Sequence, residues 1–113
     1  MGRKDSISSG DLTDTHYYIL LSLMTPMHGY AVMQKVEDLT EGHVVMGPGS
    51  VYTMIQKLLK AGYIKPSEQA AEQRKSYVIT NQGIDIFQKE LKRRKKMVEH
   101  GENALQMKGE QLP

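Results

Sequence analysis

The segment from Met46 to Ile64, MGPGSVYTMIQKLLKAGYI, decides the fold because it contains the start, both faces and the end of one helix. Pro48 and Gly49 interrupt the segment before it. Ser50 is expected to cap the helix by accepting a hydrogen bond from a backbone N–H group of the first turn. Gly62 is expected to end the helix in the left-handed conformation, after which a strand begins.

The two faces of this helix differ in chemistry. Its apolar side chains follow the spacing of a single stripe, and they are Val51, Ile55, Leu58 and Leu59. The opposite face carries Thr53, Gln56, Lys57 and Lys60. The stripe is expected to face the core, whereas hydroxyl, amide and amine groups suit phosphates and the edges of DNA bases. Ordinary solvated helices show the same pattern, so the face alone leaves both interpretations open.

The composition bounds the class of protein. At 113 residues, of which 39% are hydrophobic and 25% charged, the chain is long enough for one domain with attachments. A formal net charge of +2 is too small to indicate nucleic-acid binding by itself. The absence of cysteine excludes disulfides and thiolate metal sites, and the four histidines lack ligand spacing. No apolar run could span a bilayer, and the polar N-terminus lacks a secretory signal, so a cytoplasmic protein is expected.

Up to residue 80, the rest of the chain divides into five further segments. Residues 1–10 read as a flexible tail, and a helix capped by Asp11 or Thr13 is predicted to reach Met24. A second helix is predicted to begin at His28, with Tyr30, Met33, Val36 and Leu39 as its apolar side, and residues 43–46 fit a short strand. Residues 63–68 and 74–80 are predicted to form a β-hairpin.

A long final helix is predicted from Thr80, its cap, to about Met107. Its apolar residues recur every seven positions, with Phe87 beside the first, and they are Ile84, Leu91, Val98 and Leu105. This spacing implies a partner helix. The intervening positions are mostly polar, which favours a half-exposed helix that docks on a second subunit over a regular coiled coil.

Five consecutive cations, Lys92 to Lys96, lie within this helix. They could contact DNA flanks or an anionic membrane. The favoured interpretation is a solvated helix face balanced by Glu90 and Glu99, with at least one cationic side chain lying along the apolar stripe.

Three helices followed by a hairpin is the order of a winged helix. Three motifs carry a more specific resemblance: ILLSLM running into PMHGY at 19–30, GPGSVY followed by LLKAGYI at 47–64, and RKSYVIT followed by Gly83. Together they make the chain resemble the PadR-like transcriptional regulators, in a short form with a single C-terminal dimerisation helix. The similarity covers Leu12 to Leu91. It implies a mainly α fold with a small β-hairpin, that is, an α+β winged helix-turn-helix plus a long C-terminal helix.

The resemblance also implies a function. It suggests a homodimeric repressor that binds an inverted-repeat operator and is released by a small-molecule effector. Residues 11–80 would form the DNA-binding domain, 81–108 the dimerisation helix and 109–113 a flexible tail. The DNA-binding candidates are Ser50, Tyr52, Thr53, Gln56 and Lys57 on the helix and Arg74 and Lys75 in the wing. The dimer candidates are Ile84, Phe87, Leu91, Val98 and Leu105, with Leu12, Ile19 and Leu23 as partners.

A second function stays open at this point. A winged helix can also serve as a protein–protein interaction module, with Tyr52 and the hairpin contacting another protein. An enzyme is disfavoured because no set of nucleophile, base and orienting group can be assembled from these residues. No cofactor and no metal are expected.

Overall fold

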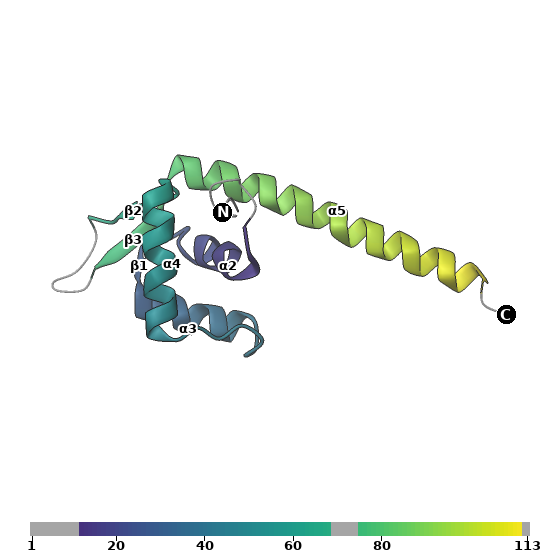
Figure 1. Ribbon diagram of the computed structural model, residues 1–113, viewed down its shortest axis with the longest axis horizontal. Helices are drawn as coiled ribbons and strands as arrows, with labels where there is room; N and C mark the ends of the chain where they lie inside the picture. Colours follow the sequence, from purple (N-terminus) through teal and green to yellow (C-terminus); the bar gives the residue numbers. More distant parts are fainter. Residues whose placement is uncertain (1–11, 69–74, 112–113) are drawn as a thin grey trace, which may run out of the picture.

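Helices and strands share one core, and a single long helix leaves it on one side (Figure 1). The computed structural model describes residues 12–68 and 75–111, so the tail expected at 1–10 lies outside the described residues. The elements in chain order are α2 (Asp14–Ser22), β1 (Met27–His28), α3 (Gly29–Leu39), α4 (Pro48–Ala61), β2 (Ile64–Pro66), β3 (Ser76–Ile79) and α5 (Asn81–Gln111).

Helix α4 has the two faces that its sequence predicted. Val51, Ile55 and Leu58 are buried, which confirms the apolar stripe, and Gly62 ends the helix with a φ of 83°. The predicted start was wrong, because α4 begins at Pro48 and Gly47 is its cap residue. Proline suits the first helical position since its ring presets φ and its missing N–H group would have no helical partner there.

The first two helices are capped as predicted. The Thr13 hydroxyl accepts a hydrogen bond from the His16 backbone N–H at 3.2 Å, and the His28 ring does the same for Ala31 at 3.3 Å. The apolar side predicted for α3 was partly wrong. Val32 and Val36 are fully buried, whereas Tyr30 and Leu39 are exposed, because one helical turn separates the two valines that face the core.

Thr40 organises the turn between α3 and α4. Its hydroxyl donates to the Val36 carbonyl oxygen at 2.8 Å and accepts from the Val44 N–H at 3.0 Å. Glu41 follows with a φ of 54°, which reverses the chain. The strand suggested for residues 43–46 does not form, since this segment has no partner strand.

We expect Thr40→Val to lower the free energy of unfolding by roughly 1–2 kcal/mol. Valine keeps the shape of threonine but leaves the Val44 N–H without its acceptor in a half-buried turn. Urea denaturation followed by circular dichroism measures this loss. Thr25→Val, at an exposed position, is the matched control. An unchanged midpoint for Thr40→Val would show that the turn is held by other contacts.

The sheet has three strands in the order β1-β3-β2, all antiparallel. The predicted hairpin is confirmed as β2 and β3, with Ile64 opposite Ile79. Strand β1 was not predicted. Its two residues pair with the outer edge of β3, Met27 opposite Tyr77, and a strand this short has no alternating pattern from which to recognise it.

The chain crosses itself tightly where α5 begins. The Thr80 hydroxyl donates to the Gly62 carbonyl oxygen at 2.7 Å, and the Thr80 backbone N–H donates to the Tyr63 carbonyl oxygen at 3.0 Å. The same hydroxyl accepts from the Gly83 N–H at 3.0 Å, which confirms Thr80 as the cap of α5. Gly83 therefore lies directly against the α4–β2 connection.

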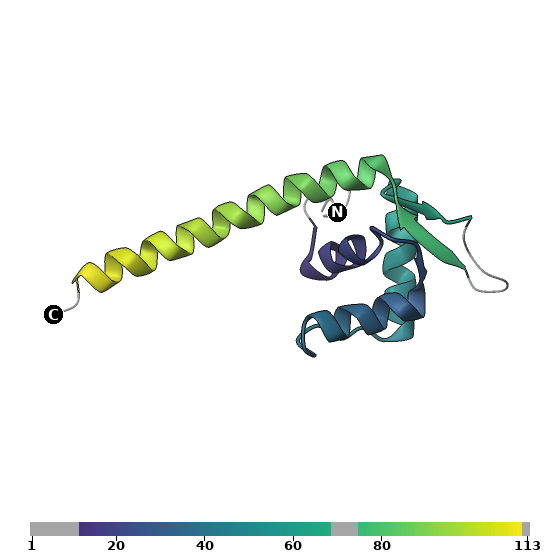
Figure 2. The ribbon, with the colours of Figure 1, turned by 180° about the vertical axis from the view of Figure 1, so that it is seen from behind.

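Helix α5 runs to Gln111, so the flexible tail expected from residue 109 is wrong over 109–111. Its first half packs on α2 and β3, whereas every residue from Lys95 to Gly109 is exposed. Figures 1 and 2 show this second half extending away from the other elements. Across the described residues, no helix combines the length and the apolar character that a membrane crossing requires.

Candidate nucleic-acid interface

The outward face of α4 presents the predicted contact residues together. All of them are exposed, and they are Ser50, Tyr52, Thr53, Gln56 and Lys57. They lie on the side opposite the buried stripe, and Lys60 extends the same face toward the end of the helix. The core thus fixes the direction in which this face points.

The first turn of α4 adds backbone groups that the sequence prediction missed. Gly47 makes no side-chain cap, and Pro48 has no N–H group. The N–H groups of Gly49 and Ser50 have no acceptor within the helix because they belong to its first turn. Gly47 and Gly49 also leave open space where a side chain would stand. The sequence signal was the Gly-Pro-Gly run, which indicated an interruption and a family motif but not a phosphate-binding backbone.

Two side chains on this face are partly engaged. The Thr53 hydroxyl donates to the Gly49 carbonyl oxygen at 3.0 Å. Toward a ligand, this hydroxyl can therefore act only as a hydrogen-bond acceptor. Tyr52 is 54% exposed. Burial raises the pKa of the neighbouring Tyr77 in β3, and the Tyr52 phenol adds to this increase.

The wing presents lysines from both of its strands. Lys75 is exposed just before β3, as predicted, whereas Arg74 lies outside the described residues. Lys65 in β2 is also exposed and pairs with Val78, and the sequence prediction missed it. The sequence could have indicated this exposure, because Lys65 directly follows the buried Ile64 and neighbouring residues of a strand point to opposite faces.

Several predicted dimer residues belong to the core of a single chain. Leu12, Ile19, Leu23 and Phe87 are buried, with Ile19 and Leu23 fully so, and they have little or no surface left for a second subunit. This part of the dimer prediction needs correction. Ile84 is half-buried against the same core. The candidates that remain on the surface are Leu91, Val98 and Leu105.

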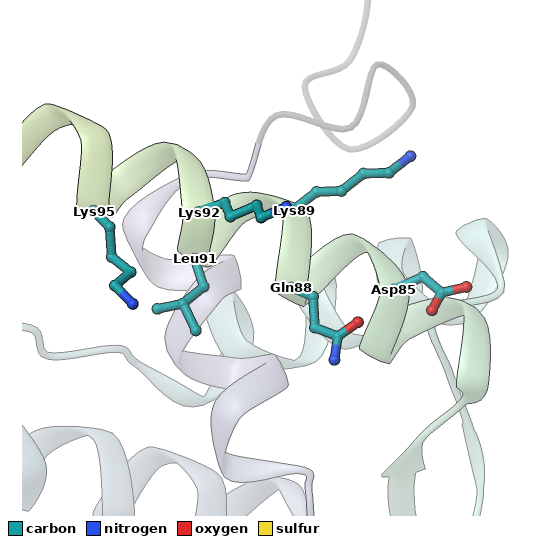
Figure 3. A pocket seen from close by; sticks show the side chains of 6 residues that line it. All are labelled: Asp85, Gln88, Lys89, Leu91, Lys92 and Lys95. Carbon is teal, nitrogen blue, oxygen red and sulfur yellow. The ribbon is translucent and has the colours of Figure 1, made fainter.

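The cationic stretch at 92–96 is largely balanced within the chain. Arg93 and Arg94 form ion pairs with Glu90, and Lys96 lies 3.6 Å from Glu99, which confirms the predicted balance by these two glutamates. The prediction of a solvated face was wrong at Glu90, whose side chain is only 1% exposed. Figure 3 shows an open hollow beside this stretch, with Gln88, Leu91 and Lys95 pointing to one side of α5. Within residues 12–68 and 75–111, no group of three His, Cys, Asp or Glu side chains could hold a metal ion.

The element order, the small sheet and the exposed face of α4 define a winged-helix protein with one added helix. Residues 19–89 match the family described as the transcriptional regulator PadR-like family. The chain belongs to this family, which is a class of transcriptional regulators and not of enzymes.

Individual relatives agree with this assignment. The fold is similar to that of a transcriptional regulator from Clostridium thermocellum, with a TM-score of 0.60 and 21% identity. The match covers 99% of this chain and 100% of that regulator. It is also similar to that of H. salinarum RosR, with a TM-score of 0.64 and 22% identity, over 90% of this chain and 97% of RosR.

A curated relative is an uncharacterized 37.1 kDa protein in transposon Tn4556 of Streptomyces fradiae. It is 31% identical over 78 residues, which are 68% of this chain and 22% of that protein. The chain therefore spans about a fifth of the length of this relative.

Proposed function

We propose that the protein is a sequence-specific DNA-binding transcriptional regulator, acting as a homodimeric repressor on an inverted-repeat operator. The observation that supports this most strongly is the exposed face of α4. Hydroxyl, amide and amine groups stand together there on a helix whose other side is locked into the core. A helix of this kind can enter the major groove and offer hydrogen bonds to base edges.

Each part of the surface has a role in this proposal. Gln56 and Lys57 would contact bases or phosphates from α4, and the N–H groups of its first turn would contact a phosphate. Lys65 and Lys75, together with Arg74, would contact the backbone from the wing. Two copies joined through α5 would present two such surfaces to one operator. Relief of repression by a small-molecule effector completes the proposal, and the resemblance to the PadR-like regulators supports it.

Titration with a duplex from the promoter region of its own gene tests DNA binding. We expect a Kd of about 10⁻⁸ M, with log K falling by about 0.9 per neutralised phosphate as log salt rises. Lys57→Ala should weaken binding by about 10- to 100-fold, and Lys75→Ala should also reduce the salt slope by about one unit. Lys108→Ala, at the far end of α5, is the matched control with unchanged affinity.

Equal affinity for a scrambled duplex of the same length would contradict sequence-specific recognition. The protein-interaction function would then be favoured, with the half-exposed Tyr52 as the anchor that contacts another protein. A double substitution separates the two functions. Lys57→Ala with Arg74→Ala should abolish operator binding if the protein is a repressor, and should leave partner capture intact if it is an interaction module.

A further inference from the structure

Among residues 12–68 and 75–111, helix α5 contacts the other elements through its first half. Beyond Arg94, every residue to Gly109 is exposed, and the segment from Lys95 to Gln111 extends by roughly 25 Å at about 1.5 Å per residue. Whatever holds α5 near Arg94 therefore determines the direction of the whole free half. The groups found there are an unusually buried carboxylate and two arginines.

Glu90 is the buried carboxylate, with a side chain only 1% exposed. It accepts hydrogen bonds from Nε of Arg93 at 3.0 Å and from Nε of Arg94 at 2.6 Å. Burial alone would raise the pKa of Glu90, but the hydrogen bonds and charges of the two arginines lower it below its ordinary value. At neutral pH the group is an ionised carboxylate held by two cations.

Arg94 connects this carboxylate to helix α2. Its guanidinium donates to Asp14 at 2.7 Å and to the Leu12 carbonyl oxygen at 3.0 Å, across 80 or more residues of sequence. It also lies 4.5 Å from the centre of the Tyr17 ring, which stacks on Phe87 with ring centres 4.7 Å apart. Arg94 is thus held in one position by two carboxylates, a carbonyl oxygen and an aromatic face.

We propose that Glu90 and Arg94 are positioning residues that set the angle between α5 and the winged helix, and so the distance between the two DNA-binding surfaces of a dimer. The part that concerns the dimer rests on the proposed function. A tilt of about 10° at Arg94 would move the end of α5 by roughly 4 Å, which is about one base-pair step. Half-sites one helical turn of DNA apart tolerate little error of this size.

A buried ion pair suits this role because it specifies geometry more than it adds stability. Apolar replacements of buried ion pairs are often as stable as the original, whereas fixed hydrogen-bond directions select one arrangement. Glu90→Gln with Arg94→Met removes both charges together, so no uncompensated carboxylate is left in the core. The expected result is a folded protein with a loosely oriented α5.

A distance measurement tests the angle without DNA. The chain contains no cysteine, so Lys35→Cys in α3 and Asn103→Cys in α5 would carry the only two spin labels. Labelled chains are diluted with unlabelled ones, so that the distances arise within single subunits. We expect one narrow distance distribution with Glu90 and Arg94 present, and a distribution about twice as wide in the double variant, because the anchor near the end of the packed half is lost.

Lys96→Met is the matched control, because it removes a cation that pairs with the exposed Glu99 of the same helix and leaves Glu90 and Arg94 unchanged. Its distance distribution should stay narrow. If the double variant does not fold, Asp14→Ala, at an exposed position, removes the carboxylate that accepts from Arg94 and should widen the distribution partially. Equal widths with and without these substitutions would overturn the proposal, whether or not the protein binds DNA.

Operators with half-site separations changed one base pair at a time test the consequence for DNA. The unaltered protein should prefer one separation by at least about tenfold, and the double variant should lose this preference while binding a single half-site equally well. A preserved preference would overturn the role of the pair in spacing. A protein that binds no operator at all would refute the proposed function, and the distance measurement would still decide the positioning role.

Discussion

Gly83→Ala is expected to destabilise this protein more than alanine at any other glycine that the structure describes. A Cβ atom at this position would clash with the carbonyl oxygen of Tyr63 and lie 2.7 Å from Cγ1 of Ile79. The first of these atoms belongs to the backbone between α4 and β2, so no rotamer change relieves the clash. The start of α5 would have to move away, which would also break the hydrogen bonds of Thr80.

We expect the free energy of unfolding to fall by about 3 kcal/mol or more and the melting temperature by about 10 °C or more. Thermal unfolding followed by circular dichroism measures both. Gly101→Ala is the matched control, because a Cβ atom there would meet nothing within 4 Å. It should raise helix stability by up to about 1 kcal/mol. Equal melting temperatures for the two variants would contradict the tight crossing described for Gly83.

Val98→Glu combined with Leu105→Glu is expected to convert a dimer into a monomer. Both side chains are exposed in the single chain, Leu105 at 75%, on the stripe that Leu91 begins. An isolated helical segment of this length is marginally stable in water, so a partner surface is needed to keep the second half of α5 helical. Two carboxylates on that surface would have to be buried on association, at a cost that prevents it.

At micromolar concentration, we expect light scattering to give the mass of a single chain for this variant and the mass of two chains for the unaltered protein. Operator affinity should fall by more than about 100-fold, because each winged helix would then bind its half-site alone. His100→Glu with Asn103→Glu places the same charges on the opposite side of α5 and serves as the control. A dimer that survives the first pair of substitutions would exclude this stripe as the interface.

The parts of the fold that depend on local patterns were predictable. The stripe of Val51, Ile55 and Leu58 and the caps Thr13, His28 and Thr80 follow from spacing and short-range chemistry, and the structure has them. The outward residues of α4 follow from the same periodicity. Their exposure is thus a direct consequence of the buried stripe.

The features that were missed depend on residues far apart in the chain. Glu90 lies in KELKRRKK, which has the composition of a solvated helix, and its burial beside Arg94 depends on the packing of α5 against the distant α2. Strand β1 exists because β3 has a free edge beside it. Ile19 and Leu23 were assigned to a dimer surface because the sequence does not show that the chain's own sheet and α5 already cover them.

The exposed half of α5 makes the integrity of this protein depend on its own abundance. No described residue covers positions 95–109, so in the proposed dimer a second subunit would stabilise their helical state by mass action. Dilution of that dimer would leave this arm uncovered, and we expect it then to unwind and to be cut early by proteases. Scarcity would thus accelerate turnover, and a cell would switch between full occupancy and near absence over a narrow range of synthesis rates.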